Sequence, residues 1–301
     1  MADSHAVGCA DARGMADAVI EEAGNNEIEK FLDHIDQIDR EYRWGVRFEK
    51  ASTQPCDEDA GFVAPLVFEL GDIRSLLANW AYVQSAMSIS DPNRLMLEYT
   101  QAMMGFLLFN PTPKTIEIIG LGGGSLAKYC HKFLPESTIR GVEVDWDVLA
   151  VADQFCMPSA SKRFEIIWAD GADFVTRDTR STDILLIDGF DSGGQPPGLC
   201  SMDFYRACRS RLNPDGILVV NLCNYPGRHG PMLARLRECF GDILTAPAEG
   251  DMNIIVFAFK NRGFKLSQSI RELAKTLQLK HPLPMTSLVE KIFGNSPDGR
   301  L

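Results

Sequence analysis

The middle of the chain alternates short apolar runs with breaks that contain glycine or an acid. Four runs are typical of buried β-strands: 115–119, a run that ends within 141–145, 164–168 and 183–187. A segment with helical spacing, 126–133, follows the first of them. This alternation predicts an α/β fold with a mostly parallel sheet.

A glycine-rich turn separates the first strand from its helix. It contains Gly120, Gly122, Gly123 and Gly124, followed by Ser125. Without Cβ atoms such a loop can lie against a ligand, while the amides of the helix N-terminus point at it. Glycine also serves purely conformational needs in turns, so this pattern alone is weak evidence for a nucleotide site.

Carboxylates follow the next strands at informative positions. Glu143 stands nineteen residues after Gly124, where nucleoside-binding α/β folds hold the ribose hydroxyls, and we expect it to bind a ribose. Asp170 with Gly171 follows the third strand, and Asp188 follows the fourth. Because ligands of open parallel sheets sit outside the carboxyl ends of the strands, these residues are expected to converge on one crevice.

Six short motifs follow one another along this part of the chain. They are GLGGGSL (120–126), GVEVD (141–145), ADGADF (169–174), IDGFD (187–191), LCSMDFY (199–205) and LNPDGILVVN (212–221). As an ordered set they resemble the core of the spermidine synthases and their bacterial spermidine-synthase-like relatives. The resemblance runs from residue 95 to 221, and more loosely over 253–259. It implies a Rossmann-like sheet of seven mostly parallel strands, of the class I AdoMet-methyltransferase type, with a small N-terminal β-appendage. Helical spacing of apolar residues before the appendage adds an N-terminal helix.

The same resemblance implies roles for individual residues. Asp170 would bind the adenine amino group, and Asp188 and Asp191 would be the two acids of an Asp-x-x-Asp signature. Tyr99 and Gln84 lie where the family lines its amine pocket, although the spacing between them is longer here. We expect Asp188 to support donor binding, and Asp191, assisted by Tyr99, to take a proton from the attacking amine.

One residue departs from the family pattern. Aminopropyltransferases usually carry an aspartate in the glycine loop, facing the free amine of decarboxylated AdoMet, and the matching residue here is Gly123. Without that carboxylate the loop tolerates either decarboxylated S-adenosylmethionine or S-adenosylmethionine. Whether an aminopropyl or a methyl group is transferred therefore stays open.

We expect an aminopropyl transferase that acts on a small cationic amine and needs no metal. An AdoMet-dependent methyltransferase would use the same nucleoside site. An NAD-dependent dehydrogenase fits less well, since Ser125 occupies the third glycine position of G-x-G-x-x-G. A non-catalytic nucleoside-binding or interaction protein is the remaining alternative.

Composition narrows the class of protein. A formal net charge of −11, without clustered Lys and Arg near the motifs, argues against a nucleic-acid partner. The eight cysteines form no C-x-x-C pair, which makes a zinc site improbable. No apolar stretch approaches 18 residues and no basic signal segment precedes one, so we expect no membrane partner and a cytoplasmic location. A homodimer is left open.

The pattern divides the chain into four segments. Residues 1–61 hold an amphipathic helix (25–43) and a linker, and 62–94 form the β-appendage. Residues 95–265 form the nucleoside-binding core, and 266–301 form a helical tail. Within the last two we expect helices at 94–109, 232–240 and 266–279, a strand at 253–259, and no recognisable chemistry in 282–301.

Overall fold

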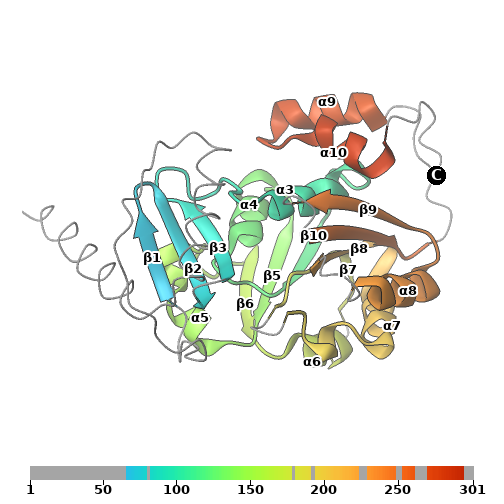
Figure 1. The fold of residues 1–301 in the computed structure, drawn as a ribbon, viewed down its shortest axis with the longest axis horizontal. Helices are drawn as coiled ribbons and strands as arrows, with labels where there is room; N and C mark the ends of the chain where they lie inside the picture. The colour runs from blue at the N-terminus through green and yellow to red at the C-terminus, as the bar shows by residue number, and fades with distance from the viewer. Residues whose placement is uncertain are drawn as a thin grey trace, which may run out of the picture.

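The computed structural model describes most of the chain from residue 66 onwards. The described ranges are 66–79, 82–177, 180–190, 194–223, 229–248, 253–261 and 270–294. They form a seven-stranded sheet with helices on both faces, beside a smaller three-stranded sheet (Figure 1). The predicted α/β core and β-appendage are confirmed, whereas the helix predicted at 25–43 lies outside the described residues and the segment boundaries stay predictions.

The large sheet has the strand order β6-β5-β4-β7-β8-β10-β9. Its strands are β4 (Thr115–Ile119), β5 (Thr138–Glu143), β6 (Phe164–Trp168), β7 (Thr182–Ile187), β8 (Leu212–Cys223), β9 (Ile243–Ala248) and β10 (Asn253–Phe259). β10 is antiparallel to both of its neighbours, and the other pairs are parallel. The order reverses between β4 and β7, and open α/β sheets bind ligands at the carboxyl ends on either side of such a switch.

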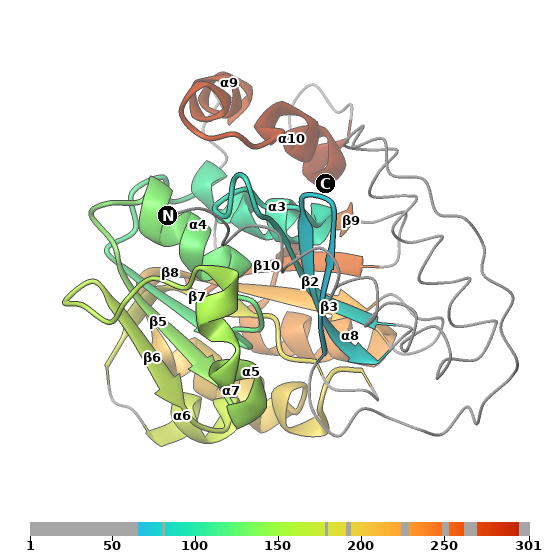
Figure 2. The same cartoon turned by 90° about the vertical axis from the view of Figure 1, so that its left-hand side faces the viewer.

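Helices cover both faces of this sheet (Figures 1 and 2). One face, here the α3 face, carries α3 (Glu98–Met103), the 3₁₀ helix η1 (Met104–Leu108), α4 (Ser125–Phe133), α9 (Ile270–Lys280) and α10 (Met285–Phe293). The other, the α7 face, carries α6 (Gly171–Arg177), α7 (Met202–Arg211) and α8 (His229–Phe240). Each strand contributes side chains to the hydrophobic core on both faces, because successive side chains alternate between the faces.

The appendage is an antiparallel sheet of β1 (Leu66–Leu70), β2 (Ile73–Asn79) and β3 (Tyr82–Ser88). Leu76 and Met87 pack against Val148 and Phe155, which belong to α5 (Trp146–Ala150) and the 3₁₀ helix η2 (Ala152–Phe155). The appendage is thereby fixed beside the segment that follows β5.

One helix prediction needs correction. The helix predicted at 94–109 begins only at Glu98. Leu95, Met96 and Leu97 are all buried, and three consecutive residues cannot share the single buried stripe of a surface helix. The tail beyond residue 282 contains α10, whose apolar side packs on the α3 face.

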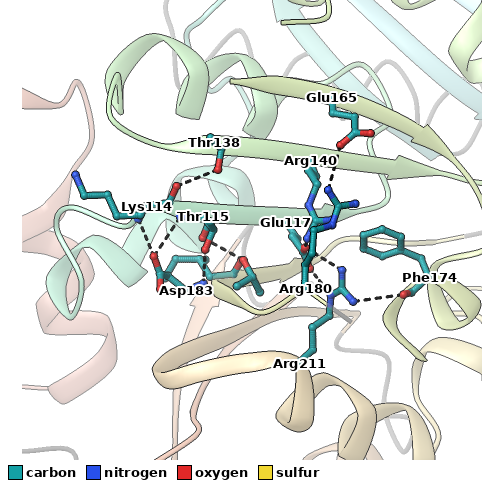
Figure 3. Close-up of polar contacts among 12 residues, drawn as sticks. Lys114, Thr115, Glu117, Thr138, Arg140, Glu165, Phe174, Arg180, Asp183 and Arg211 are labelled. Carbon is teal, nitrogen blue, oxygen red and sulfur yellow. Dashed lines mark hydrogen bonds and ion pairs between the residues drawn. The ribbon is translucent and has the colours of Figure 1, made fainter. Parts of the chain in front are cut away.

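A buried ion network joins the strands to the α7 face (Figure 3). Glu117 of β4 is fully buried and accepts hydrogen bonds from Arg140 and from Arg211, whose Nη2 lies 2.9 Å from Glu117 Oε1. Arg211 also lies over the ring of Phe174, 4.3 Å from its centroid. Since an unpaired buried charge is costly, this network ties α6 and α7 to the sheet.

Candidate active site

The glycine loop brings the ends of β4 and β7 into contact. Gly120 has φ +86°, and a Cβ atom there would lie 2.4 Å from the carbonyl oxygen of Asp188. The backbone amide of Asp188 in turn donates to the carbonyl of Ile119 over 2.8 Å. Only glycine permits this approach, which places the loop directly beside the Asp188 strand end.

Glu143 lies at the end of β5, with its carboxylate under the glycine loop. Oε2 accepts from the backbone amides of Leu121 and Gly122 at 3.0 and 3.1 Å, and Oε1 from those of Val144 and Asp145 at 2.9 and 3.0 Å. A carboxylate offers about four lone-pair sites, so each has a partner here. Glu143 therefore shapes the loop, and a ribose hydroxyl would have to share or replace one of these bonds.

Asp170 caps α6 at the end of the neighbouring strand. Its Oδ1 accepts from the backbone amides of Ala172 and Asp173 at 2.8 and 2.9 Å, and the residue is exposed. A Cβ atom on Gly171 would lie 2.3 Å from Ile119 Cγ2, which holds this turn close to β4. The turn that carries Asp170 is thus packed closely against β4.

Asp188 has a different environment from the other acids. It is partly buried, and Asn221 Nδ2 donates to its Oδ1 over 2.9 Å. Burial raises the pKa of Asp188 to about 7, although hydrogen bonds from Asn221 and Tyr99 oppose that rise, and the charge of Glu143 adds to it. The structure thus brings together Tyr99 of α3 and Asp188, which directly follows β7. Asp191 lies outside the described residues, so its role stays a prediction.

Gln84 is the extra residue of a β-bulge. Leu76 of β2 pairs with Ser85 and Leu77 pairs with Val83, so the register passes over Gln84. Its side-chain oxygen is buried and has no hydrogen-bond partner. Bulges redirect side chains and are frequent beside active sites, and an unpaired buried amide calls for a ligand or water. Its predicted contact with substrate remains a proposal.

The space beside Gly123 is filled. Its amide donates to Ser85 Oγ over 3.2 Å, and a Cβ atom there would lie 2.9 Å from Phe155 Cδ1, from Ser85 Cβ and from Ser85 Oγ. An aspartate at position 123 would therefore displace Ser85 or Phe155. The loop carboxylate of the family has no counterpart at this position.

Sequence reasoning missed several residues at this edge. Trp146 and Trp168 are 59% and 63% exposed, with ring centroids 5.2 Å apart, and Trp168 Nε1 donates to the carbonyl of Val144. Asn221 and Asn253 were also missed. Asn221 directly follows an apolar run, as Asp188 does. A search for polar residues after apolar runs would therefore have identified Asn221 as a candidate site residue.

Neither a metal cluster nor a membrane-spanning helix is present in the described part of the chain. Within those ranges no three His, Cys, Asp or Glu side chains are grouped as a metal site requires. None of the helices in the same ranges is long and apolar enough to cross a membrane.

Comparisons with known proteins match this chain to aminopropyltransferases and, over a smaller share of the relative, to a methyltransferase. The spermine/spermidine synthase domain matches residues 96–226. The polyamine aminopropyltransferase of Chromobacterium violaceum is 37% identical over 229 residues, which are 75% of this chain and 88% of that protein. The eEF1A lysine and N-terminal methyltransferase of Bos taurus is 32% identical over 209 residues, which are 62% of this chain but 30% of that protein.

A solved structure agrees with the fold. Spermidine synthase in complex with the transition state analogue AdoDATO matches with a TM-score of 0.59 at 21% identity, over 77% of this chain and 83% of that chain. At this level of identity the likeness concerns the fold alone.

Proposed function

Because the chain belongs to the spermine/spermidine synthase family, we propose that it transfers an aminopropyl group from decarboxylated AdoMet to a small amine. The observation that carries this proposal is the Tyr99–Asp188 pair beside the glycine loop. A nucleoside site and a proton acceptor adjoin there, and alkylation of an amine needs both.

The reaction sets a clear requirement for the protein. The amine nitrogen forms a bond to the carbon next to the sulfonium, the C–S bond breaks, and methylthioadenosine leaves as a neutral thioether. The amine arrives protonated at pH 7 and must lose that proton before its lone pair can attack. The protein therefore has to orient the two reactants and hold a base beside the nitrogen.

Asp188 is suited to be that base. An alkylammonium has a pKa of about 10, so proton transfer to an ordinary carboxylate is strongly uphill. Raising the pKa of Asp188 from 3.8 to about 7 lowers that cost by about 4 kcal/mol, at about 1.4 kcal/mol for each unit. In the ionised state the same carboxylate attracts the incoming cation.

The residues around the glycine loop would bind the donor. We assign the ribose to Glu143, the adenine amino group to Asp170, and the close backbone contact to the loop 120–124. The position of Glu143 beside the loop and that of Asp170 at the start of α6 support these assignments. Asp191 remains the rival candidate for the base, from its place three residues after Asp188 in the sequence.

A methyltransferase is the second candidate function. What favours it is the neutral contact between Gly123 and Ser85, where the family carries an acid, together with the likeness to the eEF1A methyltransferase. Both activities would use the same nucleoside crevice.

Product analysis decides between the two. The purified protein is incubated with decarboxylated AdoMet, or with AdoMet, and with putrescine, cadaverine, agmatine or spermidine. Release of methylthioadenosine with an aminopropylated amine supports the proposal. Formation of S-adenosylhomocysteine from AdoMet would support the methyltransferase. If neither donor is turned over, the non-catalytic alternative is favoured.

A further inference from the structure

At one edge of the sheet, three neighbouring strands each place a polar residue on the α3 face; it directly follows β7, lies two residues before the end of β8, and begins β10. The side chains that precede it on that face are apolar core residues: Ile184 and Leu186 before Asp188 on β7, Ile217 and Val219 before Asn221 on β8, and Phe257 and Ile255 on the side of Asn253 on β10. Because β7, β8 and β10 are adjacent, the alternation of side chains puts the three polar groups in one row.

Hydrogen bonds connect this row in one direction. Asn253 Nδ2 donates to Asn221 Oδ1 over 2.8 Å, and Asn221 Nδ2 donates to Asp188 Oδ1 over 2.9 Å. Asn221 is 2% exposed, so water does not compete freely for its amide. The row ends on the carboxylate that we propose as the base.

The direction matters because an asparagine amide has two ends. It can present either its NH₂ or its oxygen to a neighbour, and only the NH₂ suits a carboxylate. With Asn253 donating to its oxygen, Asn221 has its NH₂ toward Asp188. A turned amide would put oxygen against oxygen at Asp188 and NH₂ against NH₂ at Asn253.

We propose that Asn253 fixes the amide orientation of Asn221, and that Asn221 thereby holds Asp188 by Oδ1 and sets how readily this carboxylate takes a proton. The inference rests on the proposed function of Asp188 as the base. Both asparagines are positioning residues, and Asn253 acts only through Asn221.

The other groups around Asp188 stay constant when the asparagines change. They are Tyr99 on α3, Glu143 on β5 and the backbone of Gly120, which directly follows β4. A hydrogen bond donated to the ionised form lowers the pKa of Asp188, so loss of the Asn221 bond raises it. The carboxylate then ionises at higher pH.

The test compares three variants: Asn221→Leu, Asn253→Leu, and both together. The pKa of Asp188 is measured by carboxyl ¹³C NMR titration of the ligand-free protein, with the signal assigned from Asp188→Asn. We expect each single variant to raise this pKa by about one unit, the size of one hydrogen bond to a charged group. The acid limb of kcat/KM should move by the same amount, while methylthioadenosine affinity stays within about twofold.

The double variant is the sharpest part of the test. If Asn253 acts through Asn221, the Asn253→Leu change adds no further shift once Asn221 is Leu. Asn253→Ser, whose hydroxyl can still donate, should recover part of the wild-type pKa, and it also serves if a leucine variant does not fold. Additive shifts, or no shift in Asn221→Leu, would overturn the proposal.

Asn213→Leu is the matched control. Asn213 Nδ2 donates to Asp183 Oδ1 over 2.6 Å, which is an Asn–Asp bond between β8 and β7 at the opposite edge of the sheet. Loss of this bond should lower the free energy of unfolding without changing the pKa of Asp188. If Asn213→Leu shifted that pKa as much as Asn221→Leu does, the shift would reflect lower stability in general and not the Asn253–Asn221–Asp188 hydrogen bonds. Since the NMR titration needs no turnover, an inactive wild type would refute the proposed function and still leave this inference testable.

Discussion

Three carboxylates at the sheet edge differ in what their oxygens contact. Glu143 accepts four backbone amides, Asp170 caps a helix in contact with water, and Asp188 accepts from Asn221 and Tyr99. Among the three, Asp188 has two neutral donors and a pKa that burial raises, which suits a proton acceptor. We therefore expect Asp188 to take the proton, and Glu143 and Asp170 to bind the donor.

Replacing Glu143 should weaken donor binding. Glu143→Ala is expected to cost about 1.5–3 kcal/mol of methylthioadenosine affinity, the range for hydrogen bonds to a charged group. Because Glu143 also holds the glycine loop, Glu143→Gln is measured beside it, with thermal unfolding of both. Unchanged affinity in a folded Glu143→Ala protein would contradict the ribose assignment.

The pH dependence of turnover should expose Asp188. The ionised carboxylate is the active form, and burial raises the pKa of Asp188 to about 7. Its ionised fraction falls about tenfold for each pH unit below that value, so kcat/KM should fall likewise from pH 7 to pH 5. An aspartate with an ordinary pKa near 3.9 would give a flat profile over that range, and a flat profile is the contrary result.

At the level of elements, function depends on what packs behind the glycine loop. Ser85 of β3 and Phe155 of η2 occupy the space beside Gly123, so the appendage and η2 pack directly against the glycine loop. The buried network around Glu117 stabilises the α7 face in the same indirect way. Neither element is expected to touch the reacting atoms.

The Gly123 contact leads to a prediction about donors. With no carboxylate at that position, AdoMet and decarboxylated AdoMet should bind the wild type within about tenfold of each other, a difference of about 1.4 kcal/mol. Calorimetry with both donors measures this, with methylthioadenosine as the reference ligand. A strong preference for the decarboxylated donor would mean that another acid, such as Asp188 or Asp191, has taken over the recognition of its amine.

The buried network should matter for stability far more than a surface pair. Glu117→Ala removes the buried carboxylate that two arginines share and is expected to lower the free energy of unfolding by about 3–5 kcal/mol. Glu165→Ala removes an exposed pair with Arg180, 3.8 Å apart, and should cost at most about 1 kcal/mol. Denaturant unfolding of both variants checks the contrast, and equal losses would refute it.

For the whole molecule, the sequence predicted the parallel core well because buried strands bounded by glycine or acid have a distinct pattern. Strands 164–168 and 253–259 match the structure in their bounds. The late start of α3, the bounds of α10 and the Asn221–Asn253 row were not predicted. Each depends on packing between segments distant in the sequence, which local periodicity does not reveal.

The most direct measurement is single-turnover aminopropyl transfer by Asp188→Asn and Asp191→Asn, side by side. Asparagine keeps the shape and removes the base, so loss of a positioned base should slow the chemical step by about 10²–10⁴-fold. With Asp188 as the base, we expect that loss in Asp188→Asn, a smaller effect in Asp191→Asn, and methylthioadenosine affinity close to wild type in both. Wild-type turnover in Asp188→Asn, with the full loss in Asp191→Asn instead, would contradict the assignment and give the proton to Asp191.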